Sequence, residues 1–508
     1  MADIPEKSVA PVPPKHDHVT AADAPGADDA STPPSKTEEA TGPYVVDKET
    51  ERRLLRKLDI RIIPTVMWIY LMNMMDRVNI GNGRLFGLEE DLKLKGDQFQ
   101  LAVSVLFVTY CLFEAPSNMI IKRLQPARYL AGLTLAWGLI ATFSCFVQNF
   151  AALIVCRLLL GLFEAGLFPG VILYLTMFYG KRSIALRMAY FFATSAFSGV
   201  AGGLVAYGIS FLDNAGGWRA WRWIILINGI PTIVTGLLVP FILPNSPETA
   251  RFLSEEDRRV LVRMQEAEVG TARNARELDW ADVREGMRDW TVYVFSIALY
   301  CLNTMLYSFA VFLPTIVHGL GTWSRTEVQA LTVPVYFAGA VVYLVNARLS
   351  DYFQRRSYFI LGGTSVSILG YCLLIANKSV GLSYAGCFLI SMGCYTAGGM
   401  SLVWLATNNP RYGKRAMASG IHLTFGNASG VAAPFLYQTK YAPTFYPGYG
   451  ATVGVLVLSL VLNLVLLYHF NRQNKERREG KQDWKIEGKT EQEIEEMGEK
   501  SPRFRFTI

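Results

Sequence analysis

The stretch AALIVCRLLLGLFEAGLFPGVILYLTMFY, residues 151–179, decides the fold class of this chain. Only two of its side chains, those of Arg157 and Glu164, are charged. An α-helix needs about 20 mostly apolar residues to cross the hydrocarbon core of a bilayer. The stretch therefore predicts a transmembrane helix that carries two ionisable groups inside the membrane.

Eleven further stretches predict spans of the same kind. The chain has 508 residues, of which 51% are hydrophobic and 18% charged, whereas soluble proteins carry about a quarter charged residues. No span alternates with period two, and backbone polar groups in lipid must be satisfied within the segment, which favours helices over strands. We expect an all-α polytopic membrane protein with twelve transmembrane helices, near residues 60–82, 98–121, 127–147, 151–179, 184–212, 222–243, 290–317, 327–349, 357–377, 381–407, 414–438 and 446–470.

Basic residues in the loops predict the orientation of these spans. Four loops on one side hold twelve Lys and Arg residues, whereas six loops on the other side hold seven. Cytoplasmic loops carry an excess of Lys and Arg, so we expect the richer side, which also holds both termini, to be cytoplasmic. The twelve residues are Lys122, Arg123, Arg128, Lys181, Arg182, Arg187, Arg348, Arg355, Arg356, Arg411, Lys414 and Arg415.

The longest break between spans divides the chain into two halves of six spans each. It opens with PNSPETARFLSEEDRR, in which Ser254 stands three residues before Asp257, a spacing that fits a helix N-cap. We expect a disordered cytoplasmic tail over residues 1–47, a six-helix bundle over 48–243, a cytoplasmic linker with an amphipathic helix over 244–289, a second six-helix bundle over 290–471 and a cytoplasmic tail over 472–508. Two bundles related by a pseudo-twofold axis along the membrane normal are a known transporter layout.

The sequence gives no sign of a metal site, a cofactor site or an enzyme active site. All seven cysteines lie in apolar stretches and none forms a CxxC or CxxH pair, so we expect buried free thiols. No nucleotide-binding loop or nucleophile arrangement is visible. The net charge of +7 comes from basic residues scattered between apolar spans, so nucleic acid is not an expected partner.

At this point the chain resembles the major facilitator superfamily. The segment ARLSDYFQRR, residues 347–356, is similar to the superfamily's loop motif Gly-x-Leu-x-Asp-Arg-x-Gly-Arg-Arg and matches it at Leu349, Asp351, Arg355 and Arg356. Ala347, Tyr352 and Gln354 depart from it. The equivalent loop of the first half keeps Arg123 but has Lys122 where the acid would stand. The resemblance implies that these charged residues form a cytoplasmic gate.

Four further stretches resemble the anion:cation symporter family, in particular its fungal allantoate-permease-like members. They are MMDRVNIGN at residues 74–82, FEAPSN at 113–118, RLLLGLFEAGLFPG at 157–170 and GWRAWRWIILINGIPT at 217–232. The family often has an acid where Asn228 stands, so any role of that acid is absent or moved in this chain. The resemblance covers nearly the whole chain apart from the two tails and implies a transporter, but it identifies no substrate.

Charged residues inside the spans are the physical sign of function. Each ionisable side chain at a helix centre costs about 2.5–3.5 kcal/mol on insertion scales. Arg157 and Glu164 share a helix face but lie about 10 Å apart along the axis, so each needs a partner on another helix, water or a ligand. Asp76 and Arg77 diverge by about 100°, so we expect Arg77 to face a central cavity and Asp76 to face Arg157 or Glu164.

Two interpretations of these charged residues are open. In one they form static ion pairs that hold the first bundle together, with Asp76 and Arg77 as a snorkelling pair at the membrane interface. In the other they are the residues that carry out transport. The resemblance implies that Arg77 binds the substrate anion, that Asp76 and Glu164 handle protons and that Arg157 is coupled to them; two cavity arginines suit anions. Glu114, which precedes Pro116, is a further candidate proton or substrate site.

The second half offers uncharged candidates only. Asn427 is the best candidate for substrate binding, because Gly426 and Gly430 flank it in an apolar helix, and Tyr307 is another. Packing or capping roles are equally open for both. The remaining candidates for cavity groups are Asn303, Tyr336, Tyr395 and His422.

We therefore expect a secondary active transporter, monomeric and embedded in the plasma membrane, that couples protons to symport of a small organic anion such as allantoate, nicotinate or another vitamin-like carboxylate. A proton-antiport exporter of drugs or metabolites is one alternative, although GVAGGLVAYG at residues 199–208 lacks the proline that such exporters carry in the fifth span. A non-transporting nutrient receptor is another, although its usual long signalling tails are missing.

Overall fold

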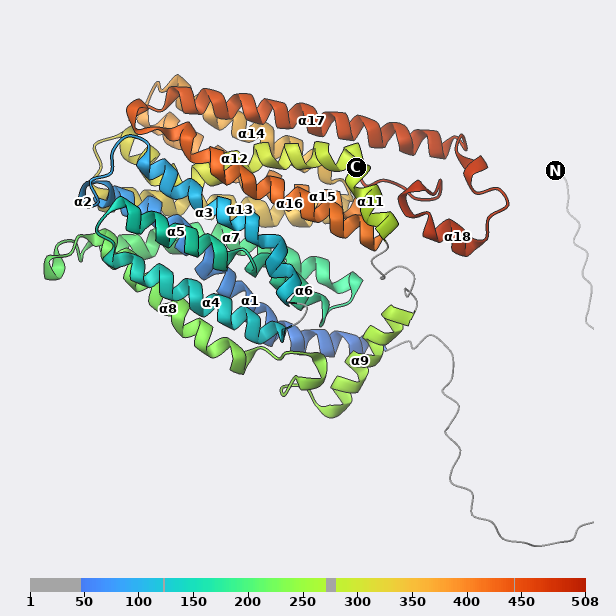
Figure 1. Cartoon of the computed structure of the whole chain (residues 1–508). Helices are drawn as coiled ribbons and strands as arrows, with labels where there is room; N and C mark the ends of the chain where they lie inside the picture. Colours follow the sequence, from blue (N-terminus) through green and yellow to red (C-terminus); the bar gives the residue numbers. More distant parts are fainter. Residues whose placement is uncertain (1–46, 122–123, 271–279, 443) are drawn as a thin grey trace, which may run out of the picture. The chain divides into compact units, whose positions relative to one another are not determined.

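The structure, a computed structural model, describes residues 47–121, 124–270, 280–442 and 444–508. All regular structure in these residues is helical, as expected, and long helices run side by side (Figure 1). The helices of the first half are α1 (Lys48–Leu85), α2 (Leu88–Asp91), α3 (Gln98–Ile121), α4 (Pro126–Phe143), α5 (Phe150–Glu164), α6 (Leu167–Thr176), α7 (Lys181–Ser210) and α8 (Ala220–Ile242). Those of the linker are α9 (Glu255–Gly270) and α11 (Trp280–Arg288), and those of the second half are α12 (Trp290–Leu320), α13 (Arg325–Phe353), α14 (Arg356–Ala376), α15 (Val380–Asn408), α16 (Tyr412–Ala432), α17 (Tyr446–Arg478) and α18 (Glu491–Glu496).

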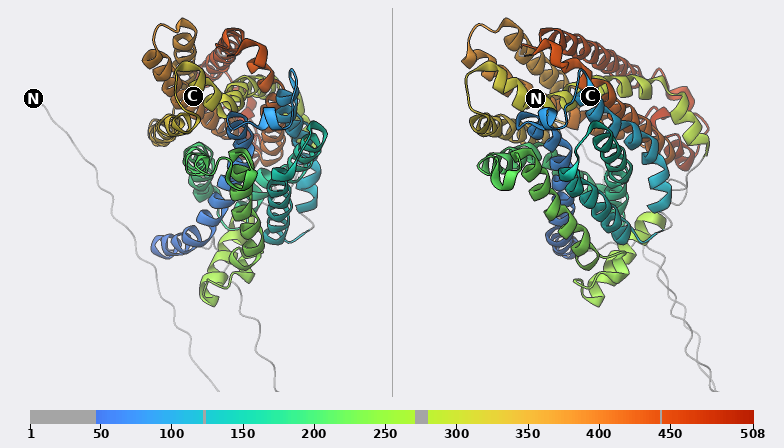
Figure 2. Two further views of the ribbon diagram at one scale, coloured as in Figure 1. Left: turned by 90° about the vertical axis from the view of Figure 1, so that its left-hand side faces the viewer. Right: turned by 60° about the vertical axis from the view of Figure 1, so that its left-hand side comes forward.

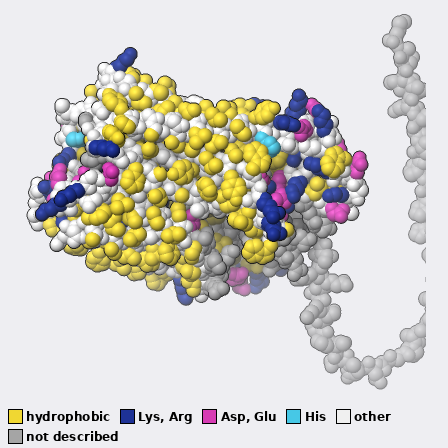
Figure 3. Space-filling model, turned by 45° about the horizontal axis from the view of Figure 1, so that its top comes forward, with side chains coloured by type: hydrophobic (Ala, Val, Ile, Leu, Met, Phe, Trp, Pro, Cys, Tyr) yellow, Lys and Arg dark blue, Asp and Glu magenta, His cyan; other side chains and the backbone are white. Residues whose placement is uncertain are grey.

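A helix, or the broken helix α5–α6, stands at each of the twelve positions where a span is expected. Nine of these in the described chain are long and apolar enough to cross a membrane, and α1, α3 and α16 occupy the other three positions. Figure 3 shows hydrophobic side chains over the middle of the visible face, with most Lys, Arg, Asp and Glu side chains towards its two ends. Such a continuous apolar surface is the expected contact area for lipid.

The helices form two bundles that repeat the same pairing (Figure 2). In the first bundle α1 packs on α7 and α8, α3 on α5, and α4 on α5 and α8. In the second bundle the helices at the equivalent chain positions pair in the same way: α12 on α16 and α17, α13 on α15, and α14 on α15 and α17. The two-bundle fold predicted from the sequence is therefore confirmed, and its internal repeat is visible in the packing.

The linker lies at one end of the bundles, which we call the linker side; the opposite end is the far side. Ser254 caps α9 as expected, because its Oγ accepts the Asp257 N–H at 3.2 Å. Lys57 of α1 forms an ion pair with the buried Asp257 at 2.5 Å, which fixes α9 to the first bundle. The last long helix, α17, continues to Arg478, beyond the predicted end of its span. The predicted N-terminal tail lies outside the described residues except for Asp47.

Contacts between the bundles run along α3 and α16, α7 and α13, and α1 and α12. Towards the far side, Gln100 Nε2 donates to the Tyr437 carbonyl at 3.0 Å and Ser104 Oγ to the Val431 carbonyl at 2.8 Å. Gly199 of α7 and Gly430 of α16 lie on two of these contacts. A Cβ on Gly199 would meet the Tyr336 ring at 2.5 Å, and one on Gly430 would overlap the Phe107 ring. The glycines therefore allow the two bundles to approach closely.

Candidate functional site

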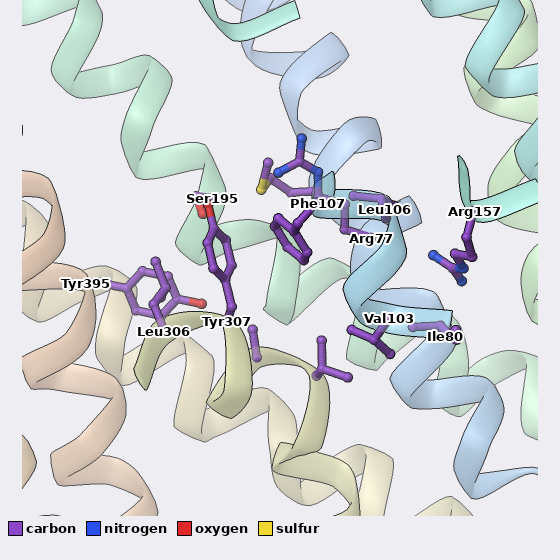
Figure 4. Close-up of a pocket in the computed structure, with 13 residues that line it drawn as sticks. Arg77, Ile80, Val103, Leu106, Phe107, Arg157, Ser195, Leu306, Tyr307 and Tyr395 are labelled. Carbon is purple, nitrogen blue, oxygen red and sulfur yellow. The ribbon is translucent and has the colours of Figure 1, made fainter. Parts of the chain in front are cut away.

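Two small adjoining cavities, of about 60 Å³ each, lie between the bundles. Figure 4 shows Arg77, Leu106 and Phe107 on one side and Leu306, Tyr307 and Tyr395 on the other. Small-molecule sites usually measure about 300–1,000 Å³, so these cavities have room for water-sized molecules but not for a whole substrate. The site is therefore closed around its polar groups in this conformation.

Arg77 and Glu164 form the central ion pair of the site. Arg77 Nε donates to Glu164 Oε2 at 2.5 Å, with the Arg77 side chain 10% exposed and the Glu164 side chain 0%. Glu164 is the last residue of α5, where the helix breaks before α6. Its other oxygen, Oε1, is buried and makes no hydrogen bond within the described residues. The pair thus links α1 to the break in α5 and leaves one acceptor unused.

Aromatic rings hold the Arg77 guanidinium on its other side. Its Cζ lies 4.6 Å from the centroid of Tyr110 and 6.0 Å from that of Phe107. The Phe107 ring in turn contacts Tyr307 of the second bundle, with centroids 4.7 Å apart. These cation–π contacts fix the guanidinium at the boundary between the bundles.

Asp76 points away from Arg77, as the 100° rotation between adjacent residues requires. It is buried, and Thr232 Oγ1 of α8 donates to its Oδ2 at 3.2 Å. Asn228, one turn earlier in α8, donates to Asn79 at 3.3 Å. Because Asp76 is buried and the Arg77 side chain is only 10% exposed, the structure does not show them as a snorkelling pair at the membrane surface.

Arg157 is buried and lines one of the cavities. Within the described part of the chain it makes no hydrogen bond or ion pair, but it lies in electrostatic range of Glu164 and Asp76. Figure 4 shows it set apart from the group around Arg77 and Tyr307. The charges of ionised Asp76, Arg77, Arg157 and Glu164 sum to zero, so each costs less to bury beside the others than it would cost without them.

A chain of polar side chains crosses from the first bundle to the second. Asn427 Nδ2 of α16 donates to Glu114 Oε2 of α3 at 3.4 Å, and Tyr307 Oη of α12 donates to Asn427 Oδ1 at 2.8 Å. Glu114 and Asn427 are buried, and Asn427 and Tyr307 line the cavity. The sequence candidates Glu114, Tyr307 and Asn427 therefore lie together, beside Arg77.

The gate candidates lie elsewhere, on the linker side between α13 and α14. Asp351 pairs with Arg356 at 3.1 Å, and the Arg355 guanidinium lies 5.7 Å from the Tyr358 ring centroid. Asp351 is thus paired within its own loop. Arg123, the candidate from the first half, lies outside the described residues.

Other sequence candidates divide into two groups. Asn303 and Tyr395 line the cavities, whereas Tyr336 donates to the Ala310 carbonyl at 3.0 Å and His422 lies 3.4 Å from the Ser401 hydroxyl. The sequence reading missed Phe107 and Tyr110, although their spacing from Glu114 by seven and four residues puts them on one helix face.

Comparison with known proteins identifies the family. The model of the Major Facilitator Superfamily matches residues 66–434 and 293–492. The chain belongs to the major facilitator superfamily. This confirms the resemblance in sequence and makes the protein a multi-pass membrane transporter, not an enzyme.

Several of its curated relatives are fungal transporters. An uncharacterized transporter of Schizosaccharomyces pombe is 40% identical over 433 residues, which cover 85% of this chain and 86% of the relative. The high-affinity nicotinic acid transporter of Saccharomyces cerevisiae is 30% identical over 456 residues, covering 90% and 85%. Among solved structures, a bacterial homologue of the human lysosomal transporter Spinster, in an inward-facing and occupied conformation, matches with a TM-score of 0.63 at 16% identity and covers 80% of this chain and 96% of its own.

Proposed function

We propose that this transporter carries a small organic anion across the plasma membrane together with a proton. The observation that carries the proposal is the buried ion pair between Arg77 and Glu164, which lies at the cavity between the bundles. Arg77 is a fixed cation with planar donors suited to a carboxylate. Glu164 occupies the place that a substrate carboxylate would take.

Exchange of one carboxylate for another couples the two solutes. A substrate anion that binds Arg77 displaces Glu164, and a displaced carboxylate in a cavity of low polarity favours its protonated form. Proton uptake by Glu164 restores the balance of charge that the anion disturbed. Asp76, held by Thr232 near Arg157, is the second proposed proton site. Arg157 without a hydrogen-bonded partner is the second positive charge available to the substrate.

The second bundle contributes the uncharged part of the proposed site. Tyr307 and Asn427 line the cavity opposite Arg77 and connect to Glu114. A substrate bound between Arg77 and these two groups would touch both bundles, so its binding could favour one arrangement of the bundles over another. Protonation of Glu114 would alter its bond to Asn427, which makes Glu114 the third proposed proton site.

We assign the linker side to the cytoplasm, with both chain ends on that side, from the excess of basic residues in its loops. The hydrogen bonds from Gln100 and Ser104 to the second bundle hold the far side together. With this orientation the conformation is closed to the outside. Alternating access would then require these far-side contacts to part, and the gate around Asp351, Arg355 and Arg356 to close. We propose that a monomer performs the cycle, since each chain contains both bundles.

The substrate class is proposed from the charges and the relatives together. A cavity lined by two arginines suits a compact carboxylate better than a neutral polyol. One relative is a nicotinic acid transporter, which favours a vitamin-like carboxylic acid. An exporter that works by proton antiport would use the same charged residues but would move its substrate in the opposite direction.

The test is uptake of labelled monocarboxylates, nicotinate included, into vesicles that contain the purified protein, with the outside either acidic or neutral. We expect accumulation only with an inward proton gradient and loss of uptake in Arg77→Gln. Arg259→Gln is the matched control, since it removes an exposed arginine paired with Glu255 in α9. Accumulation that ignores the proton gradient, or Arg77→Gln with unaltered affinity for the transported acid, would contradict the proposal.

A further inference from the structure

Residues 498–508, which we call the strap, lie against the linker-side ends of the second bundle. They begin with a short helical turn at Gly498–Lys500 and continue without regular structure to Ile508, near α11 in Figure 1. The Arg356 N–H at the start of α14 donates to the Ile508 backbone oxygen at 2.6 Å. The strap is thus attached beside the loop that holds Asp351 and Arg356.

The helices hold the strap by its backbone. Asn408 of α15 accepts the Thr507 N–H at 2.8 Å and donates to the Thr507 carbonyl at 3.1 Å. Asn474 of α17 makes the same two contacts with Phe506, each at 2.9 Å. The buried Trp404 donates its indole N–H to the Thr507 carbonyl at 2.8 Å. Two amide side chains that each bind the N–H and C=O of one residue are a way to recognise an extended peptide.

A side-chain slot fixes the register of the strap. The Phe506 ring stacks on Phe470 with ring centroids 4.7 Å apart. The Arg477 guanidinium lies 4.5 Å from the centroid of the Phe506 ring. Arg477 is buried and donates to the backbone carbonyls of Phe504 at 2.8 Å and Glu499 at 2.7 Å. A buried arginine therefore finds its hydrogen-bond acceptors largely in the strap.

An acidic side chain at the other end of the strap joins it to the linker. Glu499 is buried and accepts hydrogen bonds from Arg411 at 2.7 Å and from Lys414 at 3.0 Å. Arg411 also pairs with Asp282 and Glu285 of α11, at 2.7 and 2.6 Å. The strap, α11 and the start of α16 thus share one network of charges. Such a buried network is weakened strongly when one member is lost.

We propose that the linker-side surface of the second bundle is a peptide-binding site, that its ligand is the strap of the same chain, and that the bound strap joins α11 to α14–α17 as one body. The chemistry it recognises is an extended backbone with an aromatic residue in the Phe470–Arg477 slot and an acid between Arg411 and Lys414. Since α9 is fixed to the first bundle through Lys57, the strap adds to the direct ion pairs between Arg411 and α11 in holding this end of the linker to the second bundle.

The proposal is tested by hydrogen–deuterium exchange on the full-length protein in detergent. The backbone amides of Phe506 and Thr507 should be protected, because Asn474 and Asn408 accept them. Phe506→Ala and Asn474→Leu each remove part of the site, one from the ligand and one from the receptor. Each should speed exchange of the strap by about fivefold or more, which corresponds to the loss of about 1 kcal/mol expected for a hydrogen bond or an aromatic contact.

The coupling to the linker has its own readout and control. Glu499→Gln should speed exchange in α11 as well as in the strap, whereas Arg503→Gln, which removes only an exposed pair with Glu491, should change neither. Rapid exchange of the strap in the unaltered protein would overturn the binding site. Unaltered α11 exchange in Glu499→Gln with a released strap would overturn the joining of α11. Neither outcome depends on substrate or proton coupling, so the proposed function can fail or hold separately.

Discussion

Replacement of Glu164 by glutamine separates the two halves of the proposed mechanism. The substitution keeps the shape of the side chain and an acceptor for Arg77 Nε but removes the negative charge and the titratable proton. Arg77 then lacks a competing carboxylate. At a separation of about 4 Å and an effective dielectric constant of about 20, the lost attraction is about 4 kcal/mol.

Screening by the surroundings reduces this energy. A remainder of about 2 kcal/mol corresponds to an anion Kd about thirtyfold lower in the variant. The sign depends on pH. In the unaltered protein the ionised Glu164 competes with the anion at high pH and the protonated form does not, so affinity should fall as pH rises. In Glu164→Gln the affinity should be high and independent of pH over the same range.

The assays are equilibrium binding of a labelled carboxylate across pH and two transport modes in vesicles. We expect Glu164→Gln to lose accumulation driven by a proton gradient but to keep part of its substrate exchange, which needs no net proton movement. Glu255→Gln removes the exposed carboxylate that pairs with Arg259 and serves as the control. A Glu164→Gln protein that still accumulates substrate in response to the proton gradient, or whose Kd still rises with pH, would refute the assignment.

Three further outcomes are expected. Tyr307→Phe removes the donor to Asn427, worth about 0.5–1.5 kcal/mol, and should raise the substrate Kd by roughly two- to tenfold; an unchanged Kd would exclude Tyr307 from the site. Gly199→Val overpacks the contact between α7 and α13 at a cost of about 1–3 kcal/mol, so transport should fall at least several-fold at equal surface expression, and normal transport would show that this contact need not close. Burial opposes ionisation of Glu285, but hydrogen bonds from Arg411 and Lys500 outweigh it and lower the pKa to about 2; its contribution to stability is therefore complete above the unfolded pKa near 4.5 and lost as pH falls towards 2, and Glu285→Gln should flatten that part of a plot of thermal stability against pH.

Much of the fold followed from local sequence properties. The first and last residues of each expected span lie within a few residues of the ends of an observed helical segment. The exceptions are the start of α1, which lies earlier, and the end of α17, which lies later. Hydrophobic length predicts spans well because lipid cannot satisfy backbone polar groups and so enforces helices. The N-cap at Ser254 was likewise predicted from the local sequence alone. The extension of α17 to Arg478 was missed because its last turns are polar and are held by the strap rather than by lipid.

The sequence also identified the charged residues that lie together in the structure, but it did not show which of them pair. Adjacency alone required Asp76 and Arg77 to diverge, and spacing alone required Glu164 to find a partner outside its own helix. That this partner is Arg77, and that Asp76 accepts its hydrogen bond from Thr232, depends on how α1, α5 and α8 rotate against one another.

By itself the sequence determined that the chain is built of membrane helices, and it identified the charged residues that are costly to bury, because both depend on the free energy of single residues or single segments in lipid. Only the tertiary structure decided the pairing of Arg77 with Glu164, the bridge from Glu114 through Asn427 to Tyr307, and the binding of residues 498–508 to the second bundle. These contacts join residues 87 to 313 positions apart, or they place a polar segment on a surface that no periodicity in the sequence indicates. Helix packing sets them, and packing depends on the whole chain at once.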